Sequence, residues 1–135
     1  MFADWTCAYD SGDRPYAPGI AIDQRRPLHI VAGDAVTIRI ALVTPTGAPV
    51  VLGDGEHLVW MAKSLGEPSR KLLSKQSTVT APGSGRYQIA LATAETRLLA
   101  PGRAVHDLFA IRGSARVVVI PLSDLVIARS SLGGP

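Results

Sequence analysis

Cysteine and long apolar runs are scarce in this sequence, and each shortage excludes a class of protein. Cys7 is the only cysteine among 135 residues, which excludes an internal disulfide bond and any metal site that needs several thiolates. No apolar run reaches the roughly 20 residues that span a bilayer. The first ten residues hold two acids instead of a basic start and an apolar stretch. We therefore expect no signal peptide, no membrane span and synthesis in a reducing cytoplasm.

Motifs that mark catalytic sites are also missing. Neither G-x-S-x-G nor a phosphate-binding loop occurs, and "PGSGR" at 82–86 lacks the lysine and the following helix of such a loop. Ser84 and Gly85 are better explained by a hairpin turn. The best local pair of acids is Asp54 and Glu56 in "GDGEH", where the flanking glycines favour a turn over a calcium site.

Histidines are few, and their spacing does not suggest a metal site. The three are His29, His57 and His106. None shares a metal-ligand spacing with another. His106 precedes Asp107, but adjacent residues of a strand point to opposite faces, so the two cannot orient each other. The sequence therefore predicts structural histidines, no enzyme and no cofactor.

The first 27 residues differ in composition from the remainder. They contain three prolines and no sustained period of 2 or 3.6, which favours an extended N-terminal arm. The arm nevertheless holds four of the chain's seven aromatic residues, whose exposed surface is unfavourable without a partner. Trp5, Tyr9 and Tyr16 are candidate anchors at an interface. Arg25 and Arg26 are candidates for pairing with acidic neighbours. Whether the aromatic residues pack on their own domain or on a neighbouring subunit is left open.

A weak basic patch lies in "KSLGEPSRKLLSK" at 63–75. Its cations are Lys63, Arg70, Lys71 and Lys75, with Glu67 as the one acid. Such a patch could meet nucleic acid. A solvated hairpin is the favoured reading, because no aromatic residues interleave with these charges as single-strand binders require.

From residue 28 onward, short strands alternate with turn signals. In the clearest of them, 35–43, Val36, Ile38, Ile40 and Leu42 are expected to face inward. The expected strands are 28–31, 35–43, possible 50–52, 57–64, 70–80, 86–92, 102–113 and 115–130. The last is expected to carry a bulge or an edge position at Pro121. One short helix is expected within 93–102, capped by Thr93 and ended by Pro101-Gly102.

These elements predict an all-β fold. The expected architecture is an immunoglobulin-like antiparallel β-sandwich of about seven strands with one short helix. The expected organisation is an arm over 1–27, a sandwich over 28–130 and a loose tail over 131–135.

The order of several segments resembles a family of phage proteins. The segments are "GDAVTIRIALVTPTGAPVVL", "LVWMAKS", "GSGRYQIALATAETRLLAPGRAVHDLFAI" and "ARVVVIPLSDLVI". In this order they resemble small tailed-phage and prophage virion proteins with a sandwich similar to the N-terminal domain of baseplate upper proteins. The sequence departs from that family by its aromatic, proline-rich arm and by the lack of a long C-terminal extension. This departure favours an assembly role over host recognition.

The resemblance implies a non-enzymatic virion component of a tail, baseplate, neck or capsid surface. Its partners would be other virion proteins and copies of itself, without a small-molecule substrate, nucleic acid or membrane. The alternative is a module that binds carbohydrate or a cell surface. Such a module needs an exposed aromatic platform, and outside the arm only Trp60, Tyr87 and Phe109 are available, all in strands where burial is expected.

Overall fold

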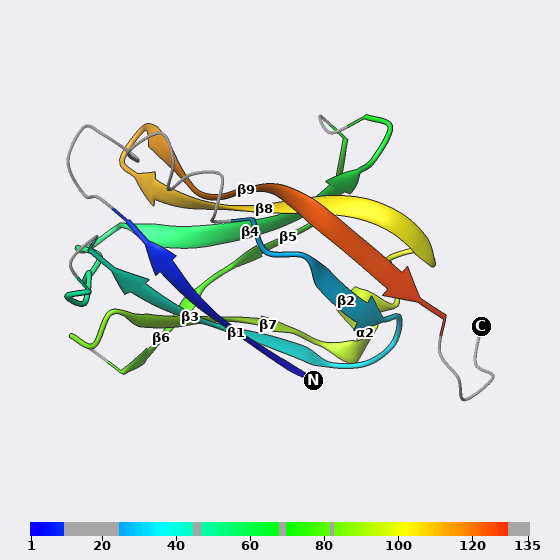
Figure 1. Cartoon of the computed structure of the whole chain (residues 1–135), viewed down its shortest axis with the longest axis horizontal. Coiled ribbons are helices and arrows are strands. Elements are labelled where there is room, and N and C mark those ends of the chain that lie inside the picture. The colour runs from blue at the N-terminus through cyan, green and yellow to red at the C-terminus, as the bar shows by residue number, and fades with distance from the viewer. Residues whose placement is uncertain (10–24, 45–46, 68–69, 82, 130–135) are drawn as a thin grey trace.

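Two β-sheets pack face to face and enclose the hydrophobic core (Figure 1). The computed structural model describes residues 1–9, 25–44, 47–67, 70–81 and 83–129. One sheet has four strands in the order β1-β3-β7-β6, and the other has five in the order β2-β9-β8-β4-β5. The prediction of an all-β sandwich with one short helix is confirmed. The described residues hold nine strands rather than about seven.

The elements have the following bounds. The strands are β1 (Phe2–Ala8), β2 (Leu28–Val31), β3 (Val36–Val43), β4 (His57–Ser64), β5 (Lys71–Gln76), β6 (Thr78–Ala81), β7 (Arg86–Leu91), β8 (Gly102–Arg112) and β9 (Ala115–Ala128). The helix is α2 (Thr93–Thr96). The expected tail, 131–135, lies outside the described residues.

Alternating side chains build the core, as the sequence of β3 predicts. Val36, Ile38, Ile40 and Leu42 are all buried, while the residues between them face outward or lie at the surface. Trp60 of β4 is fully buried in the opposite sheet. Because successive side chains of a strand point to opposite faces, one apolar set from each sheet is enough to fill the space between them.

Strand β1 belongs to the sandwich and not to a separate arm. It lies parallel to β3, from Phe2 opposite Thr37 to Ala8 opposite Val43. The physical reason is an alternation at Trp5, Cys7 and Tyr9, which puts three buried side chains on the core face. The division expected at residue 28 therefore separates β1 from the sheet to which it belongs.

A second parallel pairing joins β2 to β9, with Leu28 opposite Leu125. The sheets are therefore mixed, although the sequence predicts an antiparallel sandwich. In β9 the ladder to β8 shifts between the pairs His106–Ser123 and Leu108–Ile120. The irregularity includes Pro121, which has no N–H to donate, so the predicted bulge is confirmed.

The single strand expected at 70–80 is two strands in different sheets. β5 pairs with β4, and β6 pairs with β7. The chain crosses between the sheets at Ser77, whose N–H donates to the carbonyl of Leu58 and whose hydroxyl accepts from the N–H of Leu58. Local periodicity does not reveal this change of sheet, because both halves keep an extended backbone.

Three local details refine the expectations. Helix α2 is capped at Ala92 and not at Thr93, because the Glu95 side chain accepts the N–H of Ala92. The possible strand at 50–52 is absent from the described residues, where this segment makes only isolated backbone bonds. The hairpin turn expected at Ser84-Gly85 joins β6 to β7, and a Cβ at Gly85 would come within 3.0 Å of the Val50 backbone.

Candidate interaction surface

The described residues contain no group of three or more His, Cys, Asp or Glu side chains that could hold a metal ion. Of the two acids in "GDGEH", Glu56 has a structural role, since it accepts the N–H of Gly53 and pairs with Arg112 at 2.9 Å. No helix in this part of the chain is both long and apolar enough to cross a membrane. The candidate functional features of the described residues are a surface hollow and the charged side chains around it.

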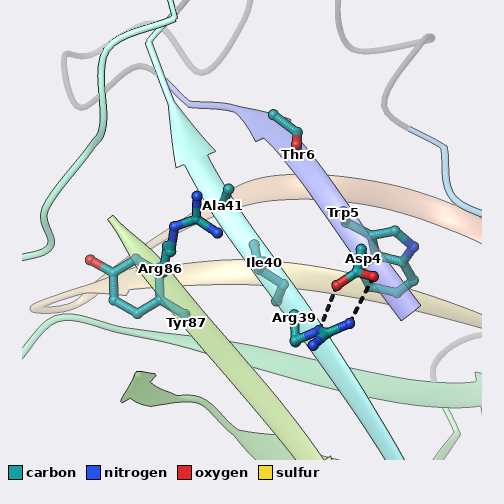
Figure 2. A pocket seen from close by; sticks show the side chains of 8 residues that line it. All are labelled: Asp4, Trp5, Thr6, Arg39, Ile40, Ala41, Arg86 and Tyr87. Carbon is teal, nitrogen blue, oxygen red and sulfur yellow. Dashed lines mark hydrogen bonds and ion pairs between the residues drawn. The ribbon is translucent and has the colours of Figure 1, made fainter. Parts of the chain in front are cut away.

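A hollow of about 270 Å³ lies over the middle of the four-stranded sheet (Figure 2). Its lining residues are Asp4, Trp5, Thr6, Arg39, Ile40, Ala41, Arg86 and Tyr87. Three neighbouring strands, β1, β3 and β7, contribute to it. Asp4 lies opposite Arg39, and Ala41 lies opposite Arg86, so the charged side chains rise around the small side chain of Ala41.

The hollow contains a bidentate ion pair. Arg39 donates from Nε to Asp4 Oδ1 at 2.6 Å and from Nη2 to Asp4 Oδ2 at 3.0 Å (Figure 2). The hydrogen bond to Asp4 raises the pKa of the already cationic Arg39. Arg39 is thus neutralised within the chain by Asp4.

An exposed aromatic ring borders this pair. Phe2 is 64% exposed, and the guanidinium carbon of Arg39 lies 4.4 Å from its ring centroid. Arginine and aromatic residues are enriched at the centres of protein interfaces, where lysine is depleted. The outer face of the four-stranded sheet therefore has the composition of a contact surface. We call the hollow with Phe2 the outer-sheet surface.

The predicted anchor residues of the N-terminal segment lie at different places. Trp5 and Tyr9 are buried in the core of their own sandwich. Arg25 is exposed, Arg26 is half-buried, and Tyr16 lies outside the described residues. In this structure Trp5 and Tyr9 adopt the arrangement in which they pack on their own domain.

Arg26, which lies just before β2, is hydrogen-bonded to residues of β1, β8 and β9. Its N–H donates to the Ser123 hydroxyl at 2.9 Å, and its guanidinium donates to the Thr6 carbonyl at 3.0 Å. Its own carbonyl lies 2.6 Å from His106 Nε2. Arg26 is therefore part of a network within the chain.

His106 is the centre of that network. The indole N–H of Trp60 donates to His106 Nδ1 at 3.0 Å, so the proton of the neutral ring is on Nε2 and is donated to Arg26. Trp5 stacks on the other side, with ring centroids 5.5 Å apart. Burial lowers the pKa of His106 to about 4, although the hydrogen bond to Arg26 and the charge of Asp124 act in the opposite direction.

His106 and Asp107 point to opposite faces of β8, as predicted. Asp107 pairs with Lys63 on the outside of the five-stranded sheet, where Lys63 and Arg116 also lie over the ring of Phe109. Burial raises the pKa of Asp107, partly offset by Lys63. The expected structural role of His106 agrees with these contacts.

The four cations of the predicted basic patch do not form one surface. Lys63 is paired with Asp107, and Lys75 is paired with Glu95 at 2.9 Å. Arg70 and Lys71 are exposed. Since Lys75 lies opposite the inward-facing Trp60 while Lys71 lies opposite Lys63, the lysines of β5 are directed to different faces.

The aromatic residues considered for a sugar platform are all buried. Trp60, Tyr87 and Phe109 have at most 8% of their surface exposed. The exposed aromatic residue that the structure does show is Phe2, which sequence reasoning assigned to an arm. Its pairing with β3 could not be foreseen, because no local signal identifies the partner of a parallel strand.

Comparison with known proteins gives a fold and no family. No family model matches the sequence, and no curated protein matches it. Among solved structures, the chain is similar to the N-terminal domain of phage TP901-1 ORF48, with a TM-score of 0.50 over 94% of this chain and 98% of that one. The sequences are 10% identical. The likeness therefore shows a fold that is also found in a phage protein.

Proposed function

We propose that this protein is a non-enzymatic structural component of a phage or phage-like particle, located in the virion and made in the bacterial host cytoplasm. It assembles through its sandwich and its first 27 residues, as a part of a tail, baseplate or neck or as an accessory protein of the capsid. Its partners are other virion proteins and copies of itself.

The observation that carries the proposal is the extent of the structural similarity. The comparison covers 94% of this chain and 98% of the phage domain, with a TM-score of 0.50. The segment order that resembles phage virion proteins gives independent support.

The surface of the sandwich suits such a role. A core filled by both sheets makes a rigid block, and the outer-sheet surface offers Phe2 and Arg86 beside the Asp4–Arg39 pair. Exposed arginine and aromatic side chains contribute much of the binding free energy when a partner buries them.

The test is the presence of the protein in particles and the effect of the outer-sheet surface on their yield. Particles would be purified by density gradient from the organism that encodes the chain, and their peptides identified by mass spectrometry. A deletion would be complemented with the wild type, with Arg86→Glu, or with Lys71→Glu as the control for an exposed cation elsewhere. We expect the chain in the particles and a loss of yield of about tenfold or more with Arg86→Glu alone.

The proposal is contradicted if the chain is absent from intact particles and its deletion leaves their yield unchanged. Circular dichroism of both purified variants checks that each is folded. A chain that is present while Arg86→Glu has no effect would keep the particle role and reject this surface as a contact.

A further inference from the structure

Among the described residues, one side chain on the core face of the four-stranded sheet is largely exposed. Trp5, Ile40, Tyr87 and Val79 form a row of directly opposite residues across β1, β3, β7 and β6. Opposite residues point to the same face of a sheet, which here is the core face. The first three are 8%, 1% and 4% exposed, whereas Val79 is 58% exposed. The core-facing side chain is therefore buried at the β1 edge of this sheet and exposed at the β6 edge.

A second exposed valine lies in a segment that is hydrogen-bonded to Tyr87, the partner of Val79 in the sheet. The Tyr87 hydroxyl accepts the N–H of Leu52 at 2.8 Å and lies 3.4 Å from the carbonyl of Val50. Val51, between them, is 56% exposed. The segments of both exposed valines thus contact Tyr87. We call Val51 and Val79 the valine corner.

The backbone at this corner is a sheet edge, and β6 forms the edge opposite β1 (Figure 1). Two of the three other edge strands of the described sheets are less suited to pairing with their own copy. β5 carries the exposed Lys71, which would place like charges in a contact between two copies. β1 carries Asp4, and its Thr6 carbonyl already accepts Arg26. β6, with the sequence TVTA, has β-branched residues and no charge.

We propose that the valine corner is covered by a second copy of this chain, whose β6 pairs antiparallel with β6 across a two-fold axis, Val79 facing Val79. A two-fold contact uses the same patch on both copies, so a neutral strand meets a neutral strand. The ladder of β6 to β7 shifts between Val79 and Ala81, which shortens the regular stretch and centres the contact on Val79. The contact adds a sheet edge to each copy and covers the exposed valines.

This contact deepens the assembly role and rests on the proposed function, since it names one way in which copies associate. The first measurement is the solution mass of the full chain over a concentration series, by light scattering. We expect a monomer–dimer equilibrium. Val79→Lys should raise the dissociation constant by about tenfold or more, because it sets two cations opposite each other.

The matched control is Leu122→Lys, on a side chain that is 43% exposed in the opposite sheet. We expect its dissociation constant to stay within about twofold of the wild type. Both positions are at the surface, so both variants should fold, which circular dichroism checks. A full chain that is monomeric at every concentration, or a dimer that Val79→Lys leaves intact, would overturn the proposal.

A crosslink tests the register directly. Opposite residues of an antiparallel pair have Cα atoms about 4.5–5.5 Å apart, within the range that a disulfide bridges. Val79→Cys should therefore form a disulfide-linked dimer on mild oxidation, faster than Leu122→Cys. Cys7 does not compete, because it is fully buried and burial raises the pKa of its thiol to about 11, against a smaller opposing effect of Arg26.

Equal crosslinking of Val79→Cys and Leu122→Cys would also overturn the proposal. The failure of this contact is distinguishable from the failure of the proposed function. A monomeric chain that is nevertheless present in purified particles rejects the β6 pairing and keeps the particle role. A chain that forms the β6 dimer but is absent from particles keeps the β6 pairing and rejects the particle role.

Discussion

The core of the sandwich must be covered along both sides where the two sheets end, and the two sides differ in how this is done. On the side bounded by β1 and β2, here called the closed side, Arg26 and His106 connect strands of both sheets and Trp5 covers the core. On the side bounded by β5 and β6, the open side, Val79 faces the core and remains exposed. One edge of a sandwich can thus be covered by side chains and hydrogen bonds of its own chain, while the other edge remains apolar and exposed to a second molecule.

The two solutions differ in their sensitivity to change. A buried polar network requires every partner, because a donor or acceptor left unsatisfied in the core is unfavourable by about 1–3 kcal/mol. An exposed valine has few contacts to lose. Substitutions on the closed side should therefore affect the stability of the monomer, and substitutions on the open side should not.

The largest effect is expected for Trp5→Ala on the closed side. It removes a buried indole that stacks on His106 and leaves a cavity, which should lower the free energy of unfolding by about 3–5 kcal/mol. Val79→Ala, on the open side of the same row, should change it by less than about 0.5 kcal/mol. Urea denaturation followed by circular dichroism measures both, and equal losses would remove the distinction between the sides.

The next effect concerns acid. The pKa of His106 is about 4 in the folded protein against 6.5 as its ordinary value, so the unfolded chain binds this proton more tightly. The neutral ring contributes full stability above pH 6.5, and the contribution is lost as the pH falls from 6.5 to 4, by about 3 kcal/mol in total. Urea denaturation at intervals across this range gives the slope.

His106→Gln isolates this contribution. The variant has no group that titrates at this position, so its unfolding free energy should vary less with pH over the same range, although it is lower at neutral pH. Asp107 acts in the opposite sense in both proteins, because its raised pKa makes the fold bind that proton more tightly. Parallel slopes for the wild type and His106→Gln would show that His106 is not the source of the dependence.

A smaller effect is expected for Ser123→Ala. The hydroxyl of Ser123 accepts the N–H of Arg26 and donates to the carbonyl of Pro121 at 2.8 Å. Its removal leaves the Arg26 N–H without this acceptor and should lower the free energy of unfolding by about 1–2 kcal/mol. Ser74→Ala, at an exposed position of β5 on the open side, is the control and should be neutral. If Ser123→Ala leaves the free energy of unfolding unchanged, the stability of the closed side comes from its aromatic contacts and not from this hydrogen bond.

The smallest effect is expected for the Asp4–Arg39 pair, which is on the closed side but outside the core. Both side chains are more than half exposed, so water and salt screen their attraction. Asp4→Asn and Arg39→Gln should shift the urea midpoint less than Ser123→Ala does. A larger shift would show that the outer-sheet surface also supports the fold.

The sequence predicted the elements whose signal is local. β4 matches its expected bounds, and the alternating residues of β3 are buried as expected. The signal in β1 was also present, at Trp5, Cys7 and Tyr9. It was obscured because it covers only five residues before a proline- and glycine-rich stretch.

Features that depend on distant partners could not be predicted. The change of sheet at Ser77 and the parallel pairing of β1 with β3 join segments whose own sequences do not specify each other. The candidate site depends on the same pairings. Arg39 lies between inward-facing residues of β3, but its pairing with Asp4 follows from a register that only the folded chain defines.

The pairing of β2 with β9 has a consequence for how the protein reaches its structure. Residues 28–31 pair with residues 125–128, so one edge of the five-stranded sheet forms only when β9, the last strand of the described residues, is available. Because closing so long a loop is entropically unfavourable before any contact forms, folding should be slow compared with helical domains of this size. A nascent chain on the ribosome would hold β2 unpaired until β9 has left the exit tunnel.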